Sequence, residues 1–215
     1  MGIGGVPNAV CEALLNHQEL GLHTEVLTQG ALNLIRQGVV TNQHKKLYRH
    51  QTAFTFAAGD LELYKAVHNN PSMGCYAVSQ INEPWMIAQN DNMVSVNSFI
   101  EIDFSGQVNA EFVKHQFSGV GGQLDFIRGA KMSKGGKAIL AGHSTTKGEK
   151  MSKIIPRLNS ITTDTRLDVD YVVTEYGSCR LTGLSTSERT KALIHLAHPK
   201  FRDELTRQAK ELHFI

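Results

Sequence analysis

The sequence contains little cysteine. Its three cysteines, Cys11, Cys75 and Cys179, are odd in number, lie far apart in 215 residues and form no C-x-x-C pair. This spacing argues against a disulfide-stapled secreted domain and against a cysteine zinc site. It is typical of reduced thiols, and we therefore expect a cytoplasmic protein.

Long apolar runs and an excess of one charge are also missing. No run approaches the roughly 20 residues that span a bilayer, and residues 1–6 have no basic segment followed by an apolar one. A membrane protein and a signal peptide are therefore not expected. Lys and Arg total 22 against 20 Asp and Glu, and this near balance gives no electrostatic case for a nucleic-acid partner. Basic pairs such as Lys45-Lys46 are expected to be solvated surface.

Three common site motifs are incomplete. Gly142-His143-Ser144 lacks the last glycine of a nucleophile elbow, and Pro7 and Leu124 occupy the third glycine position of two dinucleotide-binding patterns. Gly135-Gly136-Lys137 has no Ser or Thr after the lysine, as a P-loop requires. Serine-hydrolase, Rossmann and P-loop functions are therefore disfavoured.

Histidine is common, but only one close pair stands out among the ten. His195 and His198 would share one helix face, and no Cys, Asp or Glu set nearby completes a coordination sphere. We therefore expect a role at a helix end and no metal site.

What the sequence does contain is an alternation of short apolar segments with amphipathic ones. Such β-α alternation predicts an α/β fold, a mostly parallel sheet flanked by helices. The expected strands are Thr24–Leu27, Thr52–Ala57, Lys137–Ala141 and Asp170–Thr174, and the expected helices are Asn8–Leu15, Gly30–Gln37, a helix capped by Gly59-Asp60 and running through His68, Ser187–Ala197 and Phe201–Leu212.

One segment departs from the alternation. Residues Val94–Phe104 run at period two, which predicts a long half-exposed strand. Ser105-Gly106 then turns the chain toward Gln107–Asn109 as a hairpin, so the sheet should be mixed.

The first residues suggest that the chain begins within a fold. A glycine turn such as Gly2-x-Gly4-Gly5 normally follows a strand, and no strand precedes it here. Our interpretation is that a larger protein extends upstream. The alternative is a flexible start to a complete domain.

Two features point to acyl transfer. His23-Thr24-Glu25 places a carboxylate beside the short apolar run Val26-Leu27, and Ser118–Gln123 (Ser-Gly-Val-Gly-Gly-Gln) is rich in glycine. A carboxylate nucleophile and main-chain amides exposed by glycine are the two parts needed for transfer through an acyl-glutamate. This combination suggests chemistry on a thioester, in which His23 is a packing neighbour because a carboxylate is already ionised at neutral pH.

Matching stretches over nearly the whole chain resemble the acetyl-CoA hydrolase and CoA-transferase family, in its C-terminal half. Each stretch is a weak signal alone, but their order and combination are specific. They are Gly2–Val10, Leu22–Val26, Ala88–Ser98, Gly119–Gly129, Val172–Gly177 and Ala197–Pro199.

The resemblance implies a CoA-transferase type of α/β fold and a ping-pong reaction. Glu25 would attack an acyl-CoA to give an acyl-glutamyl anhydride, and the CoA thiolate would then form a glutamyl-CoA thioester. An incoming carboxylate such as acetate would receive the CoA by the reverse steps. Acetyl-, butyryl- or 4-hydroxybutyryl-CoA would serve as donor, with no metal or organic cofactor.

The resemblance also implies roles for other residues. Main-chain amides near Val6 and in the glycine cluster would hold an oxyanion, Asn82 would bond near the carboxylate or the CoA amide, and Glu175 would tune the acyl-binding side. Plainer alternatives are a helix cap for Asn82 and a strand-end ion pair for Glu175. The full set of oxyanion and CoA-binding candidates is Val6, Gly119, Gly121, Gly122, Gln123, Asn82, Glu175 and His143.

We therefore expect residues 1–215 to be the C-terminal catalytic domain of a CoA-transferase that lacks its N-terminal half. Its partners would be acyl-CoA, short carboxylic acids, and that missing half or a second subunit. Two other functions remain open: a thioesterase of the same family, in which water replaces the acceptor acid, and a non-catalytic fragment that binds CoA or a partner domain.

Overall fold

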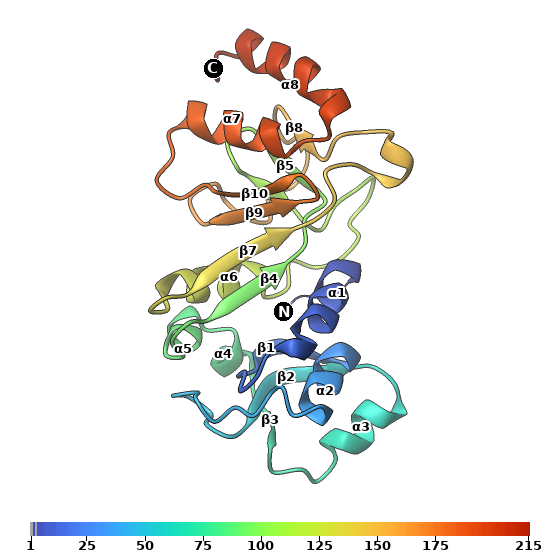
Figure 1. Ribbon diagram of the computed structural model, residues 1–215, viewed down its shortest axis with the longest axis vertical. Helices are drawn as coiled ribbons and strands as arrows, with labels where there is room; N and C mark the ends of the chain where they lie inside the picture. Colours follow the sequence, from blue (N-terminus) through green and yellow to red (C-terminus); the bar gives the residue numbers. More distant parts are fainter. Residues whose placement is uncertain (1, 3) are drawn as a thin grey trace. The chain divides into compact units, whose positions relative to one another are not determined.

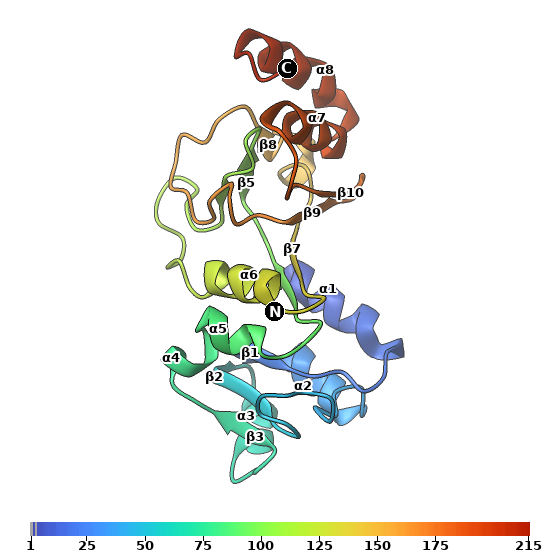
Figure 2. The ribbon, with the colours of Figure 1, turned by 90° about the vertical axis from the view of Figure 1, so that its left-hand side faces the viewer.

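The computed structural model describes Gly2 and residues 4–215, and the chain folds into two compact units (Figures 1 and 2). Unit 1 comprises Met1–Asn97 and Arg128–Lys137, and unit 2 comprises Ser98–Ile127 and Ala138–Ile215. Each unit is built from two separate stretches. The chain therefore passes between them at three points, one of them inside helix α6 (Gln123–Met132).

Unit 1 is built on a parallel sheet. Strand β1 (His23–Thr28) pairs with β2 (Thr52–Ala58), and β2 pairs with β3 (Met73–Cys75). All three strands run in the same direction, as expected for strands joined by helical crossovers. The other elements of the unit are α1 (Gly5–Ala13), the 3₁₀ turn η1 (Leu14–Asn16), α2 (Gln29–Arg36), α3 (Leu61–Val67), α4 (Val78–Ile81), α5 (Pro84–Ala88) and β4 (Val94–Asn97).

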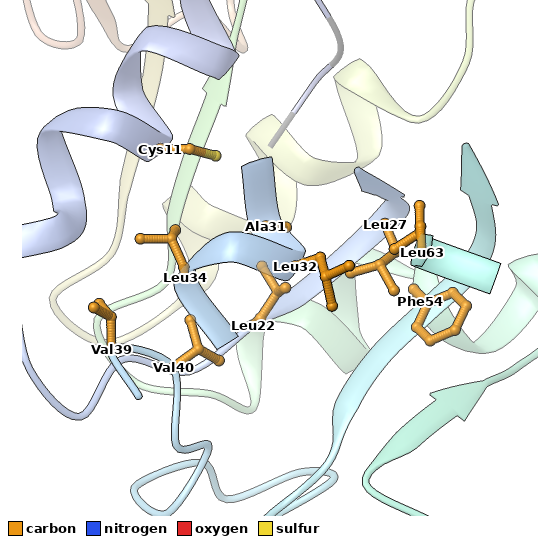
Figure 3. Close-up of a cluster of buried hydrophobic side chains, with 10 residues drawn as sticks. All are labelled: Cys11, Leu22, Leu27, Ala31, Leu32, Leu34, Val39, Val40, Phe54 and Leu63. Carbon is orange, nitrogen blue, oxygen red and sulfur yellow. The ribbon is translucent and has the colours of Figure 1, made fainter. Parts of the chain in front are cut away.

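The core of unit 1 lies where helices α2 and α3 meet the first two strands (Figure 3). Leu27 of β1, Leu32 of α2, Phe54 of β2 and Leu63 of α3 are almost wholly buried. Burial of each such side chain stabilises the fold by about 1.5–3 kcal/mol. The apolar face of α2 therefore fixes the position of β1, the strand that carries Glu25.

Helix starts in unit 1 follow their local sequence. Thr28 caps α2 by accepting a hydrogen bond from Ala31 N, and the Asp60 carboxylate caps α3 by accepting from Glu62 N and Leu63 N. The expected cap at Asp60 is confirmed. α1 begins three residues earlier than expected, because Pro7 lies inside its first turn, where a missing N–H costs nothing.

Unit 2 contains mixed sheets. β10 (Gly177–Arg180) pairs antiparallel with β9 (Tyr171–Thr174), which pairs parallel with β7 (Lys137–Ala141). β5 (Glu101–Asp103) pairs antiparallel with β6 (Val108–Asn109) and parallel with β8 (Ile154–Ile155). The expected hairpin, with Gly106 at φ 96°, is confirmed. The predicted α/β class and mixed sheet are thus both found.

Two helices complete unit 2, and the 3₁₀ turn η2 (Lys147–Glu149) lies before β8. α7 (Thr186–Leu196) begins with a capping box, in which Ser185 and Glu188 satisfy each other's main-chain amides. α8 (Pro199–Glu211) is capped by His198, whose Nδ1 accepts from Lys200 N. The helix-end role expected for this histidine pair is confirmed for His198.

The long strand expected over Val94–Phe104 is wrong. β4 ends at Asn97 and β5 begins at Glu101, so the segment forms two strands that belong to different units. Phe99, in the link, is 3% exposed and packs so closely on Gly142 that a Cβ there would stand 3.1 Å from the ring. The period-two pattern did not reveal this break, because Phe99 is buried out of phase with it.

Candidate active site

Strand β1 holds Glu25 at the edge of a buried environment. Thr24 is 1% exposed and Val26 6%, while Glu25 between them is half-buried. The Asn82 side chain donates a hydrogen bond from Nδ2 to Oε1 of Glu25 at 3.1 Å. Residues 57 positions apart are thus brought together at the predicted nucleophile.

Asn82 is placed by the junction of two short helices. It ends α4, and its main-chain N–H donates to Val78 O at 2.8 Å. The alternative of a cap on the following helix is wrong, because Glu83 caps α5. Asn82 is 6% exposed, and its Oδ1 has no hydrogen-bond partner within the described chain. A buried amide oxygen without a partner is available to a ligand N–H.

His23 precedes Glu25 by two residues on β1, and it is buried. Its Nε2 lies 2.8 Å from Ile81 O, and its ring is tilted against Tyr48 at a centroid distance of 5.9 Å. Burial lowers the pKa of His23 to about 4. A neutral imidazole at physiological pH agrees with the expected packing role.

Lys45 corrects an expectation from the sequence, because it is buried and not part of a solvated surface. Its Nζ donates to Leu22 O and Gln51 O, both at 2.7 Å, and burial lowers its pKa to about 7. The ammonium ties residues 45–51 to the residue before β1. A Lys-Lys pair in sequence does not distinguish a buried lysine from an exposed one, so no signal could have identified it.

Val6 lies in the first turn of α1 and is half-buried. Gly4, with φ 121°, precedes the helix in a conformation that favours glycine. The first main-chain amides of a helix have no acceptor within the helix, so this turn can offer donors to an anion.

The predicted glycine loop, residues Ser118–Gly122, lies in unit 2 and leads into α6. A Cβ on Gly119 would meet no heavy atom within 4 Å, and Gly121 has φ 59°. The first glycine thus leaves its peptide open to solvent, and the second needs the left-handed region. Gln123, directly after the loop, donates from Nε2 to Oδ2 of Asp164 at 2.6 Å.

Glu175 follows β9 and is held by a residue that the sequence analysis missed. Its two carboxylate oxygens accept from Ser144 Oγ at 2.8 Å and Ser144 N at 2.9 Å, and His143 Nδ1 lies 3.9 Å from Oε2. Burial alone would raise the pKa of Glu175, but these hydrogen bonds and the nearby His143 lower it below its ordinary value. Glu175 is therefore a fixed negative charge.

The predicted residues thus fall into three local groups and one helix start. Glu25 meets Asn82 in unit 1, where Val6 lies in the first turn of α1. In unit 2, Gln123 follows the glycine loop, and His143 lies near Glu175. Among the described residues, no group of three His, Cys, Asp or Glu side chains could hold a metal ion. Within the same part of the chain, no helix is long and apolar enough to cross a bilayer.

Comparison with known proteins gives a consistent result. Residues 59–209 match the acetyl-CoA hydrolase/transferase C-terminal domain. The chain is 46% identical to 4-hydroxybutyrate coenzyme A transferase of Clostridium kluyveri, over 98% of this chain and 50% of that protein. It is similar to the crystal structure of RipA from Yersinia pestis, with a TM-score of 0.96 and 50% identity over 100% of this chain and 49% of that one.

A second solved structure agrees with the first. The 4-hydroxybutyrate CoA-transferase of Porphyromonas gingivalis gives a TM-score of 0.84 and 43% identity, covering 98% of this chain and 50% of that one. The chain therefore spans about half the length of the relatives that it matches. The family domain match begins at residue 59, after β1, whereas the full-length relatives align over nearly the whole chain, including the region of Glu25.

Proposed function

Because the chain belongs to the acetyl-CoA hydrolase/transferase family, we propose that it carries the nucleophile of a CoA-transferase. The enzyme would move CoA between an acyl-CoA, such as acetyl-, butyryl- or 4-hydroxybutyryl-CoA, and a free carboxylate such as acetate. The observation that carries the proposal is the half-buried Glu25 carboxylate, bonded to buried Asn82 on a strand fixed by the core.

In the first step, one carboxylate oxygen of Glu25 attacks the acyl carbon of the thioester. The C–S bond breaks, the thiolate of CoA leaves, and an acyl-glutamyl anhydride forms. The thiolate then attacks the side-chain carbonyl carbon of Glu25, which releases the carboxylate and gives a glutamyl-CoA thioester. The acceptor carboxylate reverses the two steps. No proton is gained or lost overall, so no general base is required.

Asn82 serves this chemistry through the bond that it already makes. When Glu25 becomes an anhydride or a thioester, Oε1 becomes a carbonyl oxygen. It turns into an oxyanion each time a nucleophile attacks the side-chain carbonyl carbon of Glu25. The Asn82 amide already donates to that atom in the unreacted protein, and it would keep this bond through the step. A preorganised donor of this kind stabilises the transition state by about 3 kcal/mol. Its unpaired Oδ1 would accept from an amide N–H of CoA.

The remaining candidates act on the substrate side. The main-chain amide of Val6, at the start of α1, and those of Gly119, Gly121 and Gly122, in the glycine loop, are each candidate donors to the oxyanion of the acyl carbonyl. Gln123 would shape the pocket beside the glycine loop, and His143 would approach the CoA chain. The fixed negative charge of Glu175 would tune the acyl side.

We further propose that activity needs a second half. The chain spans about half the length of its relatives, and an N-terminal half would complete the CoA pocket. The working unit would then be this domain with that half, or with a further subunit, in the cytoplasm. It would use CoA as a substrate without a metal or organic cofactor, and would act neither on nucleic acid nor at a membrane.

Trapping of the thioester tests the proposal. The chain is incubated with butyryl-CoA, alone and with the separately expressed N-terminal half of the C. kluyveri relative, and treated with hydroxylamine. Peptide mass spectrometry then locates any hydroxamate. We expect it at Glu25, absent in Glu25→Gln and present in Glu12→Gln, a control at an exposed glutamate on α1.

Each outcome has a distinct meaning. Modification of the chain alone shows a working site in this half, and modification only after addition of the second half shows an incomplete enzyme. No modification in either mixture would overturn the transferase proposal. Release of CoA without any added carboxylate would favour the hydrolase alternative that the family description includes.

A further inference from the structure

Two buried carboxylates of unit 2, Glu111 and Asp164, have no role in the reaction proposed above. Glu111 is 6% exposed and Asp164 is fully buried. Neither makes an ion pair within the described part of the chain, although removal of a carboxylate from water is expensive. A buried carboxylate whose hydrogen bonds are satisfied makes the surrounding segments more rigid.

Glu111 holds the beginning of the glycine loop. Gln116 Nε2 donates to Oε2 of Glu111 at 2.8 Å and to Ser118 O at 2.6 Å, so one amide joins the carboxylate to the first residue of the loop. The main-chain N–H of Phe117 also donates to Glu111 O, at 2.8 Å. The other carboxylate oxygen accepts from Thr163 Oγ1 at 3.0 Å.

Asp164 holds the end of the same loop. Its Oδ2 accepts from Gln123 Nε2 at 2.6 Å, directly after Gly122. Its main-chain N–H donates to Val108 O at 3.1 Å, which anchors Asp164 to β6. The two ends of the loop are therefore attached to adjacent residues. The first end is linked to Thr163 through Gln116 and Glu111, and the second end is linked to Asp164 through Gln123.

We propose that Glu111 and Asp164 are positioning residues, which fix the glycine loop from both ends so that its peptide amides keep one orientation. The loop needs external support, because Gly119 has no side chain to pack and Val120 is 55% exposed. Glycine leaves a free loop with more conformations than any other residue.

The charges around Asp164 make this support dependent on pH. Burial raises the pKa of Asp164 to about 6, the bond from Gln123 opposes this, and the facing carboxylates of Asp168 and Glu111 raise it further. Above that pKa the Gln123 bond is charge-assisted and stronger. Below it the proton can occupy Oδ1, which has no partner in the described chain, and the Gln123 bond becomes an ordinary neutral one. The loop should therefore be firmer at pH 7 than at pH 5.

A catalytic role for the fixed loop rests on the proposed function, because the transferase reaction forms the oxyanion that the loop amides would bind. The positioning itself does not depend on that function. It can be measured in the full chain without any CoA ester, so failure of one proposal leaves the other standing.

Hydrogen exchange of the peptides covering residues 112–123, expressed as protection factors, tests the inference. Asp164→Ala removes the acceptor and should lower loop protection about tenfold, as expected for the loss of one buried hydrogen bond. Asp164→Asn keeps an acceptor oxygen without a charge. It should restore most of the protection and remove the difference between pH 5 and pH 7.

Two further variants complete the design. Asp203→Ala, at an exposed position of α8, is the matched control and should leave the loop unchanged. Gln123→Met removes the donor of the same hydrogen bond at a half-buried position, so it should lower loop protection as much as Asp164→Ala does. It also tests the proposal if Asp164→Ala folds poorly. Loop protection equal to the control in Gln123→Met, in a chain with an unchanged thermal transition, would overturn the proposal.

Discussion

Asn82 contributes a hydrogen-bond donor to the Glu25 carboxylate. It is buried, bonded to Oε1 at 3.1 Å, and its own Oδ1 is left for a ligand. The sequence suggested either a contact with the carboxylate or a helix cap for this residue. Only the fold could decide, because the contact joins a strand to a helix end 57 residues later.

Replacement of Asn82 by alanine should slow the reaction more than it destabilises the fold. The lost donor stabilises the oxyanion by about 3 kcal/mol, so the rate of glutamyl-thioester formation should fall on the order of 100-fold. The rate is measured by hydroxylamine trapping with the complementing half. Asn33→Ala is the control and should react at the native rate, because Asn33 is exposed on α2 and its side chain makes no hydrogen bond to any described residue. Equal rates in both variants would exclude a role for Asn82.

His23 should remain neutral over the physiological pH range. Burial lowers its pKa to about 4, from an ordinary value of 6.5. In an NMR titration of the ring carbons, we expect almost no change for His23 between pH 8 and pH 5. A midpoint above 6 for His23 would show that it is not buried.

At the scale of elements, the segments that sequence predicts best are those with local signals. β7 runs from Lys137 to Ala141 as expected, and α7 follows the predicted helix within a residue at each end. Both have clear periodicity and start signals. α6 (Gln123–Met132) is not among the helices expected from the sequence.

The break between β4 and β5 shows what local signals cannot provide. The period-two pattern places Val94, Val96, Ile100, Ile102 and Phe104 on one apolar face. Val94 of that face is nevertheless 46% exposed, whereas Phe99, on the opposite face, is 3% exposed. The two strands pair with different partners, and their pairing is decided by residues far away in sequence. Period two therefore identified extended chain correctly but not its continuity.

The capping box of α7 offers a measurement at this scale. Ser185→Ala removes the acceptor for Glu188 N and should lower the free energy of unfolding by about 1 kcal/mol. Urea unfolding followed by circular dichroism measures it. Ser187→Ala is the control two residues later, where the side chain makes no hydrogen bond within the described part of the chain. It should change stability by less than about 0.5 kcal/mol. A similar loss in both variants would mean that the cap contributes nothing specific.

For the whole molecule, sequence reasoning identified the α/β class, the mixed sheet and the family, but not the division into two units. The boundary between Asn97 and Ser98 divides a segment that was expected to form one strand. Arg128–Lys137 then belong to unit 1, although the residues before and after them belong to unit 2. The crossing between Asn97 and Ser98 has no glycine-rich or proline-rich linker, whereas the crossing after Lys137 directly follows Gly135-Gly136. A single glycine pair between a helix and a strand is also typical of an ordinary turn, so composition alone did not identify the boundary.

The two units should respond to acid in opposite directions. The depressed pKa of His23 means that unit 1 loses stability as pH falls from 6.5 toward 4, because the unfolded chain binds the proton first. The raised pKa of Asp164 means that unit 2 gains stability as pH falls from 6 toward 3.8. When the pH falls from 7 to 5, His23 should change the free energy of unfolding by about −2 kcal/mol and Asp164 by about +1 kcal/mol.

Hydrogen exchange of core peptides at the two pH values measures this difference. Peptides from β1 and β2 should lose protection at pH 5, and peptides from β6 should gain it. His23→Gln should remove the first change and Asp164→Asn the second, each without effect on the other unit. Parallel changes in both units would mean that other groups dominate the acid response.

The path of the chain also has a consequence for synthesis on the ribosome. Unit 1 is incomplete until Arg128–Lys137 has emerged, because Asn92 N donates to Lys134 O at 2.8 Å, and Ile87 packs on Gly129 without room for a Cβ. A nascent chain that ends at Asn97 therefore exposes apolar surface that its own later residues cover. Residues 98–127 belong to unit 2, so they remain unfolded outside the tunnel until the rest of that unit has been made. Release of unit 1 from chaperones should accordingly follow translation of Lys137, some forty codons after its last strand has been made.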